Sequence, residues 1–406
     1  PIVDIPDNLD GLVLPDRSTV KEVYAQAVAD LRKGEELMTV YKSAIYASKY
    51  SAQALLAKMY AYMSGTYENP NKTYADSSYY YANEVIKSGK FQLLSRDVFM
   101  TYNQMTPDSK AQVETVFAVK RMDAEITNYN PVIGSMYANI QDVGWGEIYT
   151  SQKYLDLLNE TGYNDWTSEN FTDARAAFIH PQYTQKNGLP VRAFRFFHEV
   201  YDKNGTLTGY TYKQGEIAEQ GTTLTTKIGE DTYTLTPVNA GNKKYSIEYN
   251  GKVYVGQDDY MMKLNNGYPM FYCYKCSLED GIPQLHSPIV SRLAEMYLLC
   301  AEAAAKTGNY ELARTNVNIV RERSLPGKGY ASMDATNAKE LIMKERQLEL
   351  AWEGWRRQDL VRFGKFTRAY SSRPQLPDEE NGYTTVFPIP EKIRVMNTKL
   401  KQNPGY

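Results

Sequence analysis

The segment that most constrains how this chain can fold is Lys344–Arg362, with the sequence KERQLELAWEGWRRQDLVR. Leu348, Trp352 and Trp355 recur in it at helical spacing and continue a stripe that starts at Leu341. This spacing predicts an amphipathic helix whose apolar face docks on a core. We therefore expect both Trp residues to be architectural and to lie outside any binding site.

The other positions of this segment carry charges of both signs, three or four residues apart. Such positions are neighbours on a helix surface and can pair. We expect the pairs Arg346–Glu349, Glu353–Arg356 and Glu353–Arg357. Gly354 stands where Ala would be favoured in a helix by about 1 kcal/mol, so it indicates close approach by another segment.

Composition excludes several classes of protein. The 406 residues are enough for a large core or two domains. A net charge of −2 and a pI of about 6.1 argue against a nucleic-acid binder. The mean hydropathy is −0.54, and no run of about 18 apolar residues predicts a membrane-spanning helix. Because the sequence begins at Pro1, we expect a processed or truncated product whose signal peptide lies outside it.

Cysteine spacing and missing motifs argue against catalysis. The three Cys residues are an odd number and imply no disulfide framework. Cys273 and Cys276 fall in a strand-like run, where they would point to opposite faces, so we predict no metal site. Nucleotide-binding glycine motifs, HExxH and GxSxG are absent. We predict no cofactor, no catalytic residue and no enzymatic activity, although a glycosidase pair of carboxylates would be invisible in sequence.

Several stretches predict helices. Ser18 or Thr19 would cap the first helix, with Glu22 near its third position. Its buried stripe would be Val20, Val23, Tyr24, Ala27, Val28 and Leu31. Further helices are expected over Tyr50–Ser64, Tyr74–Ser88, Leu293–Lys306 and Tyr310–Arg323.

A short internal repeat suggests how these helices pair. Leu56–Tyr60 reads LAKMY and Leu293–Tyr297 reads LAEMY, and each helix is followed by a second with small residues inside. The turn at Thr307–Asn309 then makes a helical hairpin of tetratricopeptide type. We predict a mainly α fold: a tetratricopeptide-like helical-pair (α-solenoid) scaffold with long ordered loops and a small β-rich insertion. The helical pairs would occupy residues 17–100 and 289–366.

The β-rich insertion is expected over about residues 200–275. Its predicted strands, which alternate in polarity, are Leu224–Ile228, Thr232–Leu235, Tyr245–Tyr249 and Val253–Val255. Asn250-Gly251 between two of them is a strong hairpin signal. A separate strand-like run is Glu114–Val119.

The section 128–175 is rich in Gly, Asn, Tyr and Trp, and only Ser151–Asn159 in it resembles a helix. Ordered loops on a rigid scaffold are where binding concentrates. The chain has 35 Tyr, an excess that suits a surface on which sugars stack. Trp166 leads the candidates because its loop has no apolar neighbours, whereas the glycines beside Trp145 also suit a structural role. The predicted ligand-binding residues are Trp166, Tyr163, Asn164, Asp165, Trp145, Tyr137, Asn139 and Tyr149.

Two motifs carry a family resemblance. ERQLELAWEGWRRQDLVRFGKF, at 345–366, resembles the signature helix of the SusD/RagB-type nutrient-binding lipoproteins of Bacteroidota. FPIP at 387–390 and QNPGY at 402–406 resemble that family's C-terminal tail, although Arg394-Val395 stand where an acidic residue is common. The resemblance continues, in chain order, over Arg17–Leu31, the Trp145 loop, Asp173–Arg175 and Leu293–Arg323; we take Asp173–Arg175 as structural.

The resemblance implies one SusD-like domain over residues 1–406, without the family's usual N-terminal part. It implies a non-catalytic lipoprotein on the outer-membrane surface, held by a lipid anchor outside this sequence. The protein would bind an oligosaccharide or polysaccharide and deliver it to a SusC-like TonB-dependent transporter. Two alternatives stay open: a RagB-like peptide-binding lipoprotein of a peptide importer, and a helical-repeat docking protein without its own small ligand.

Overall fold

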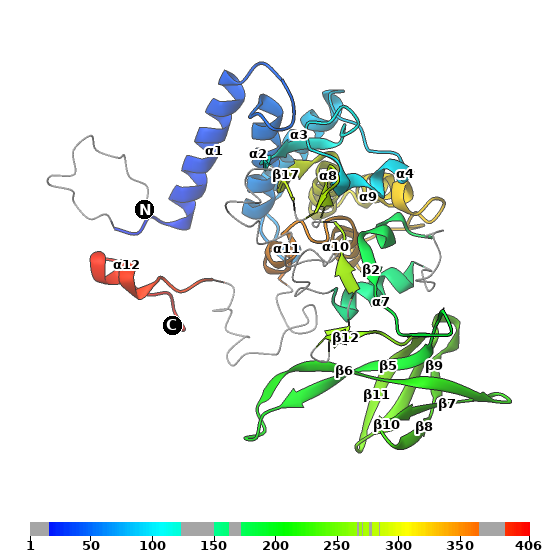
Figure 1. The fold of residues 1–406 in the computed structure, drawn as a ribbon. Coiled ribbons are helices and arrows are strands. Elements are labelled where there is room, and N and C mark those ends of the chain that lie inside the picture. The colour runs from blue at the N-terminus through cyan, green and yellow to red at the C-terminus, as the bar shows by residue number, and fades with distance from the viewer. Residues whose placement is uncertain are drawn as a thin grey trace.

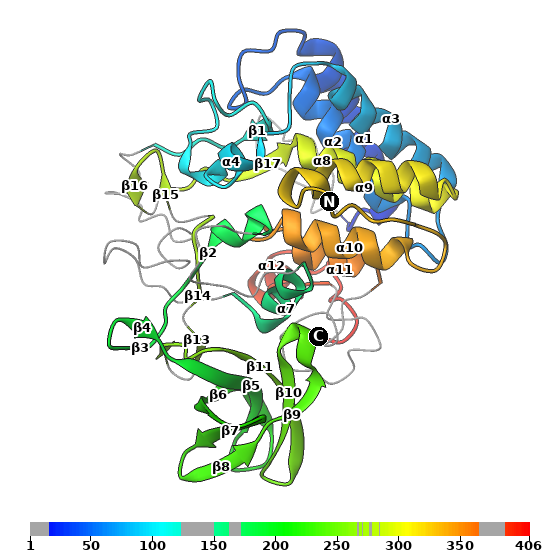
Figure 2. The same cartoon turned by 90° about the vertical axis from the view of Figure 1, so that its right-hand side faces the viewer.

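The computed structural model describes residues 16–122, 150–161, 172–265, 268–269, 271–275, 278–283, 285–364 and 386–406. In these ranges a body of helices adjoins one large sheet, which projects from it (Figure 1, Figure 2). The helices are α1 (Val20–Leu37), α2 (Lys49–Met63), α3 (Lys72–Lys87), α4 (Arg96–Phe99), α7 (Gln152–Glu160), α8 (Leu293–Thr307), α9 (Tyr310–Ser324), α10 (Ala338–Glu349), α11 (Arg356–Arg362) and α12 (Glu391–Met396). None of these helices is long and apolar enough to span a membrane.

Helix α8 is the centre of the helical body. Its residues from Leu293 to Lys306 are buried except Tyr297, so it has no solvent face. A helix that is apolar on nearly every side must be enclosed by neighbours. Helices α3 and α9 pack against it, and α10 covers it as well. Small residues such as Ala294 and Ala301 let these neighbours approach closely.

The predicted helical pairs are present. Helices α2 and α3 pack on each other, as do α8 and α9, and α3 joins the two pairs through α8. Each of these helices begins and ends within two residues of the prediction. The first core, between α2, α3 and α8, buries Leu56, Ala82 and Met296.

Helix α1 only partly matches its prediction. Thr19 is the N-cap, and Glu22 completes a capping box with it, as expected. The predicted burial of the stripe is wrong, because α1 has no buried residue: Val20 is 70% and Val23 is 48% exposed. Val28 and Leu31, further along, are half-buried against the first core. The cause is that α1 lies at the edge of the body (Figure 1) and packs against α2.

The prediction of one helix over Lys344–Arg362 is wrong. Helix α10 ends at Glu349 and α11 begins at Arg356. Between them Trp352 has φ 63° and Gly354 has φ 83°, left-handed values that a continuous right-handed helix excludes. A Cβ on Gly354 would meet no described atom within 4 Å. Gly354 therefore serves a chain turn, and not the close approach that we predicted.

The large sheet has seven antiparallel strands in the order β8-β7-β6-β5-β11-β10-β9. They are β5 (Arg192–Tyr201), β6 (Leu207–Gln220), β7 (Thr223–Ile228), β8 (Asp231–Thr234), β9 (Thr236–Asn239), β10 (Lys244–Tyr249) and β11 (Lys252–Tyr260). The sheet curls, because β8 contacts β10 although four strands separate them in the order. Inside the curl Phe194, Phe196 and Ile247 are buried. The sheet spans residues 192–260, close to the region of about 200–275 expected, and it contains three strands that we did not name, β5, β6 and β9.

Short strand pairs complete the description. They are β1 (Thr115–Ala118) with β17 (Ile289–Arg292), β2 (Ile179–Pro181) with β14 (Phe271–Cys273), β3 (Gln185–Lys186) with β4 (Leu189–Pro190), β12 (Leu264–Asn265) with β13 (Tyr268–Pro269), and β15 (Leu278–Glu279) with β16 (Ile282–Pro283). Strand β1 confirms the isolated strand predicted at Glu114–Val119. Its partner β17 runs directly into α8, so β1 ties that end of α8 to the chain before residue 122.

Gly256 of β11 gives a test of how the sheet packs. A Cβ there would lie 2.3 Å from the carbonyl oxygen of Arg195 and 2.5 Å from the Phe194 ring, both on β5. We expect Gly256→Ala to lower the free energy of unfolding by about 1–3 kcal/mol, because the close contact forces the backbones apart. Urea unfolding would measure this. Val255→Ala, at an exposed neighbour, is the control, and equal stability of the two variants would contradict the packing described.

Candidate functional site

The predicted ligand residues themselves lie outside the described part of the chain. These are Tyr137, Asn139, Trp145, Tyr149, Tyr163, Asn164, Asp165 and Trp166. The structure does describe the segments that lead into and out of their loops: Thr150–Thr161, which contains α7, and the chain from Thr172 onward. The contacts of these two segments show how the chain is held on either side of residues 162–171.

Helix α7 anchors the middle of the loop section. It confirms the helix predicted at Ser151–Asn159, and the Ser151 side chain accepts a hydrogen bond from the Tyr154 backbone N–H at 3.4 Å. Tyr154, Leu155 and Leu158 are buried, and they pack in one cluster with Leu348 of α10. The apolar face of α7 is thus held against the segment Lys344–Arg362.

Two further contacts tie α7 to that segment. The Tyr154 ring meets the Trp352 ring edge-on, with 4.7 Å between centroids. Glu160, the last residue of α7, forms an ion pair with Lys344 Nζ at 2.7 Å. Trp352 is therefore architectural, as predicted. Trp355 is as well, because it packs against a second apolar core, formed by α8, α9, α10 and α11, and its ring lies 3.6 Å from Lys58 Nζ.

Asp173 and Arg175 anchor the chain where it leaves the loop section. They flank the start of η2 (Ala174–Phe178), and Asp173 accepts a hydrogen bond from the Arg175 backbone N–H at 3.0 Å. The Arg175 guanidinium also donates to both Asp173 oxygens, at 2.8 and 2.7 Å, and reaches Glu345 of α10. Both side chains are fully buried. A buried bidentate pair of this kind fixes geometry, in keeping with the structural role expected of it.

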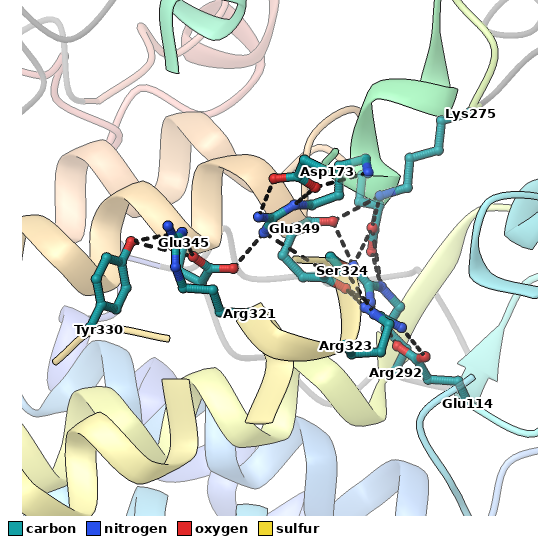
Figure 3. A network of polar contacts seen from close by, with 12 residues as sticks. Glu114, Asp173, Lys275, Arg292, Arg321, Arg323, Ser324, Tyr330, Glu345 and Glu349 are labelled. Atoms are coloured by element: carbon teal, nitrogen blue, oxygen red, sulfur yellow. Dashed lines mark hydrogen bonds and ion pairs between the residues drawn. The ribbon is translucent and has the colours of Figure 1, made fainter. Parts of the chain in front are cut away.

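Glu345 and Glu349 lie one turn apart on α10 and gather cations from distant segments (Figure 3). Glu345 pairs with Arg175 and, at 3.0 Å, with Arg321. Glu349 pairs with Arg292 at 2.6 Å and also with Arg323. Arg346–Glu349, predicted to pair along the helix, does not form, because Arg346 instead binds Asp359 at 2.8 Å through two nitrogens.

Further carboxylates close this group of charges. Glu114 binds Arg292 at 2.7 Å and Arg323 at 3.0 Å, and Glu353 binds Arg292 and Lys275. We call the whole set the Glu349 cluster. Its members are Glu114, Asp173, Arg175, Lys275, Arg292, Arg321, Arg323, Glu345, Glu349 and Glu353 (Figure 3).

The charges of the Glu349 cluster balance electrostatically. Burial by itself raises the pKa of the Glu349 carboxyl, but the guanidiniums of Arg323, Arg292 and Arg175 outweigh it and hold that pKa below its usual value. The same competition, with Arg292 and Lys275 as the cations, lowers the pKa of Glu353. At neutral pH both carboxyls are therefore charged, and the cluster is a set of compensated ion pairs.

A second buried group, the Glu302 cluster, joins α8 to α11. Its members are Glu302, Lys306, Arg346, Asp359 and Arg362. Lys306 binds Glu302 at 2.8 Å and also donates to the carbonyl of Gly65 at 2.6 Å, beyond α2. Burial raises the pKa of Glu302, but Arg362 and Lys306 overcome this effect and bring it from 4.5 to about 2.

These clusters can position chain segments, and their chemistry suits that role. Most of their members are buried and all are paired, so the charges are committed to one another. Among the described residues no three His, Cys, Asp or Glu side chains lie together as a metal site would require. Together with the apolar packing of α7, the clusters hold two described parts of the loop section, α7 and Asp173, against α10.

Comparisons with known proteins agree with this architecture. The sequence pattern of the SusD family matches residues 113–406. The chain belongs to the SusD family. SusD-family proteins are nutrient-binding proteins, generally for glycans, and pair with SusC-like transporters. The match takes in the whole Glu349 cluster and the loop section.

Individual relatives are similar at lower identity. SusD-like protein P38 of Formosa agariphila is 24% identical over 410 residues, which cover 98% of this chain and 67% of that protein. A SusD superfamily structure from Bacteroides thetaiotaomicron has a TM-score of 0.63 at 21% identity and covers 100% of this chain and 70% of its own. A putative sugar binding protein from Bacteroides vulgatus has a TM-score of 0.61 at 19% identity, with the same coverage. These similarities show a SusD-like fold.

Sequence reasoning missed most partners of the two clusters. The charged residues of Lys344–Arg362 are evident in the sequence, but nothing local indicated that Glu114, Lys275 or Arg292 would bind them. One signal was available: Arg292 precedes the mostly apolar run Leu293–Ala305, and it is fully buried in this SusD-family fold. An isolated Arg or Glu beside a run of buried residues calls for a partner elsewhere in the chain.

Glu349 offers a test of the cluster. We expect Glu349→Gln to lower the free energy of unfolding by about 3–5 kcal/mol, because Arg292 and Arg323 would keep buried charges with less compensation. Chemical unfolding followed by circular dichroism would measure the loss. Glu311→Gln is the control, since Glu311 forms an exposed ion pair with Arg314 on α9. That pair should contribute under about 1 kcal/mol. Equal losses would contradict a clamping role.

Glu302 offers a test by pH. Its folded-state pKa of about 2 lies below its usual 4.5. Its charge therefore stabilises the fold above pH 4.5, by about 3 kcal/mol, and that contribution fades as the pH falls towards 2. We expect the difference in unfolding free energy between parent and Glu302→Gln to shrink from pH 7 to pH 3.5. Glu36→Gln, at an exposed site, should show no such trend. A difference that stays constant with pH would refute the assignment.

Proposed function

We propose that this SusD-family protein binds an oligosaccharide or polysaccharide through loops of residues 128–175 and delivers it to a SusC-like TonB-dependent transporter. The observation that carries the proposal is how this section is held on α10: α7 packs on Leu348 and pairs with Lys344. Asp173 is joined through Arg175 to the buried carboxylate of Glu345. Rigid support of this kind preorganises a binding loop, which limits the entropy lost on binding. The chemistry of the loops, rich in aromatic and amide side chains, complements a sugar.

Family membership and similarity support the remaining parts of the proposal. One structure of similar fold bears the description of a putative sugar binding protein. We propose that the protein is non-catalytic and acts on the outer-membrane surface as a lipoprotein. We further propose that α2–α3 and α8–α9 are tetratricopeptide-like units, and that the chain forms one SusD-like domain with the large sheet as an insertion.

Trp166 is the residue on which we test the binding site. We expect Trp166→Ala to weaken polysaccharide binding at least tenfold, because the variant loses the ring on which a sugar face would stack. Affinity gel electrophoresis with amylopectin, laminarin, xylan, galactomannan and pectin measures it. Tyr80→Ala is the control, because Tyr80 is a 56% exposed ring on α3, outside residues 128–175. If Trp166→Ala binds polysaccharide as tightly as the parent, Trp166 is not part of the binding site.

The same panel separates the proposal from its alternatives. If the parent binds none of these polysaccharides but binds a mixture of short peptides in calorimetry, the RagB-like peptide importer replaces it. If it binds neither and yet co-purifies with a transporter barrel, it is a docking protein. Release of reducing ends from a bound polysaccharide would show a glycoside hydrolase.

A further inference from the structure

We propose that the outer end of the seven-stranded sheet is a second glycan contact, formed by an aromatic platform on which one pyranose ring stacks. The platform consists of His198, Tyr233, Tyr249 and Tyr254. It lies in a part of the chain where we predicted no ligand residue. The inference rests on the proposed function, since it assigns the sheet to the same class of ligand.

The topology places these residues away from the helical body. Strand β5 leaves the body at Arg192 and β11 returns to it at Tyr260, where the two strands pair. Their opposite ends, near Tyr201 and Lys252, therefore project outward with the Asn250–Gly251 hairpin turn of β10 and β11. In Figure 1 and Figure 2 this is the end of the sheet furthest from the helices.

Tyr249 organises the four rings. Its centroid lies 5.5 Å from His198 and 5.7 Å from Tyr233. His198 and Tyr254, 5.7 Å apart, are inclined by only 34°, so their faces have similar directions. Phe196, 2% exposed, lies beneath them and contacts both Tyr249 and Tyr254. The buried floor holds the rings in place, while the four rings above it are only half-buried.

Polar groups border these rings. Glu199 accepts hydrogen bonds from Lys252 Nζ at 2.8 Å and from the Tyr254 hydroxyl at 2.9 Å. Burial opposes its ionisation, but these two donors bring the pKa of Glu199 down to about 2. Burial and nearby Lys213 lower the pKa of His198. At neutral pH the border therefore offers a carboxylate, an ammonium and a neutral imidazole, which has one donor and one acceptor nitrogen.

This combination fits a sugar better than a macromolecular surface. A pyranose has an apolar C–H face that stacks on a ring, and equatorial hydroxyls that both donate and accept hydrogen bonds at its edge. Fully covered aromatic side chains bury roughly 150–250 Å² each, so these four, which are mostly covered, leave on the order of 200 Å². A stable protein interface needs about 800 Å² on each side. The Glu199–Lys252 ion pair also cancels the local charge that would attract a nucleic acid.

Tyr233→Ala tests the platform, because Tyr233 is on the edge strand β8 and its removal takes away one ring. Affinity gel electrophoresis with the five polysaccharides named above is the assay. We expect at least a fivefold weaker affinity for whichever of them retards the parent. Lys252→Ala, at an exposed side chain that is not needed for packing, should weaken it at least twofold. Tyr80→Ala should have no effect, and circular dichroism checks that every variant folds.

Each outcome decides between the two proposals. Loss of binding in Trp166→Ala, but parental binding in both Tyr233→Ala and Lys252→Ala, overturns the platform and leaves the proposed function intact. Weaker binding in the two sheet variants, with the control unchanged, supports the platform. A parent that is retarded by none of the five polysaccharides overturns the proposed function and the platform together.

Discussion

The structure depends on the burial of charge around α10. An ion moved from water into a protein interior costs several kcal/mol, and only well-placed opposite charges offset that cost. In the Glu349 cluster the offset requires several separate segments to meet around α10. They are the residue before β1 (Glu114), η2 (Arg175), the residue Lys275 after β14, the β17–α8 junction (Arg292) and α9 (Arg321 and Arg323). Arg292 and Glu114 are 178 positions apart in sequence. The cluster therefore selects one arrangement, since any other would leave a buried charge without a partner.

This constraint fixes the position at which the chain leaves the loop section. Replacing buried ion pairs by apolar residues can preserve stability, so the pairs are not simply a source of it. Apolar contacts, however, tolerate sliding, whereas a bidentate pair such as Arg175–Asp173 permits one geometry. With Arg175 also bound to Glu345, the chain that leaves the loops has a fixed origin on α10. Helix α7 is held differently, by apolar packing on Leu348 and Trp352 and by an exposed ion pair between Glu160 and Lys344.

Local rules predicted the parts of this fold that local interactions form. Thr19 and Glu22 specified a helix start, Asn250-Gly251 specified a hairpin, and the helix pairs followed from apolar periodicity. The predictions fail where contacts between distant segments override the local preference of the backbone for a helix. Trp352 adopts a left-handed conformation that few Trp residues accept. It does so because α10 and α11 must each present charges to different partners: Glu349 to Arg292, and Asp359 to Arg346.

The candidate site was less predictable than the fold for a related physical reason. The residue types of a sugar site, namely aromatic rings with polar neighbours, recur throughout a chain with 35 Tyr. Sequence pattern singled out loop residues such as Trp166, because a ring in a polar loop lacks an obvious core. It could not single out Tyr233 or Tyr249, because a ring at an alternating strand position suits a core equally well. Only the curl of the sheet, which leaves them half-buried, distinguishes them.

The weak internal repeat also has a physical cause. Lys58 and Glu295 occupy the same position of the two LAxMY segments, and they bind each other at 2.8 Å with little exposure to solvent. Where equivalent positions of two copies meet, an identical charged residue would face its own like charge. Burial would make that repulsion severe. An ion pair can form here only if the two segments carry opposite charges at this position. The repeat is therefore interrupted at the position where the two helices bind each other.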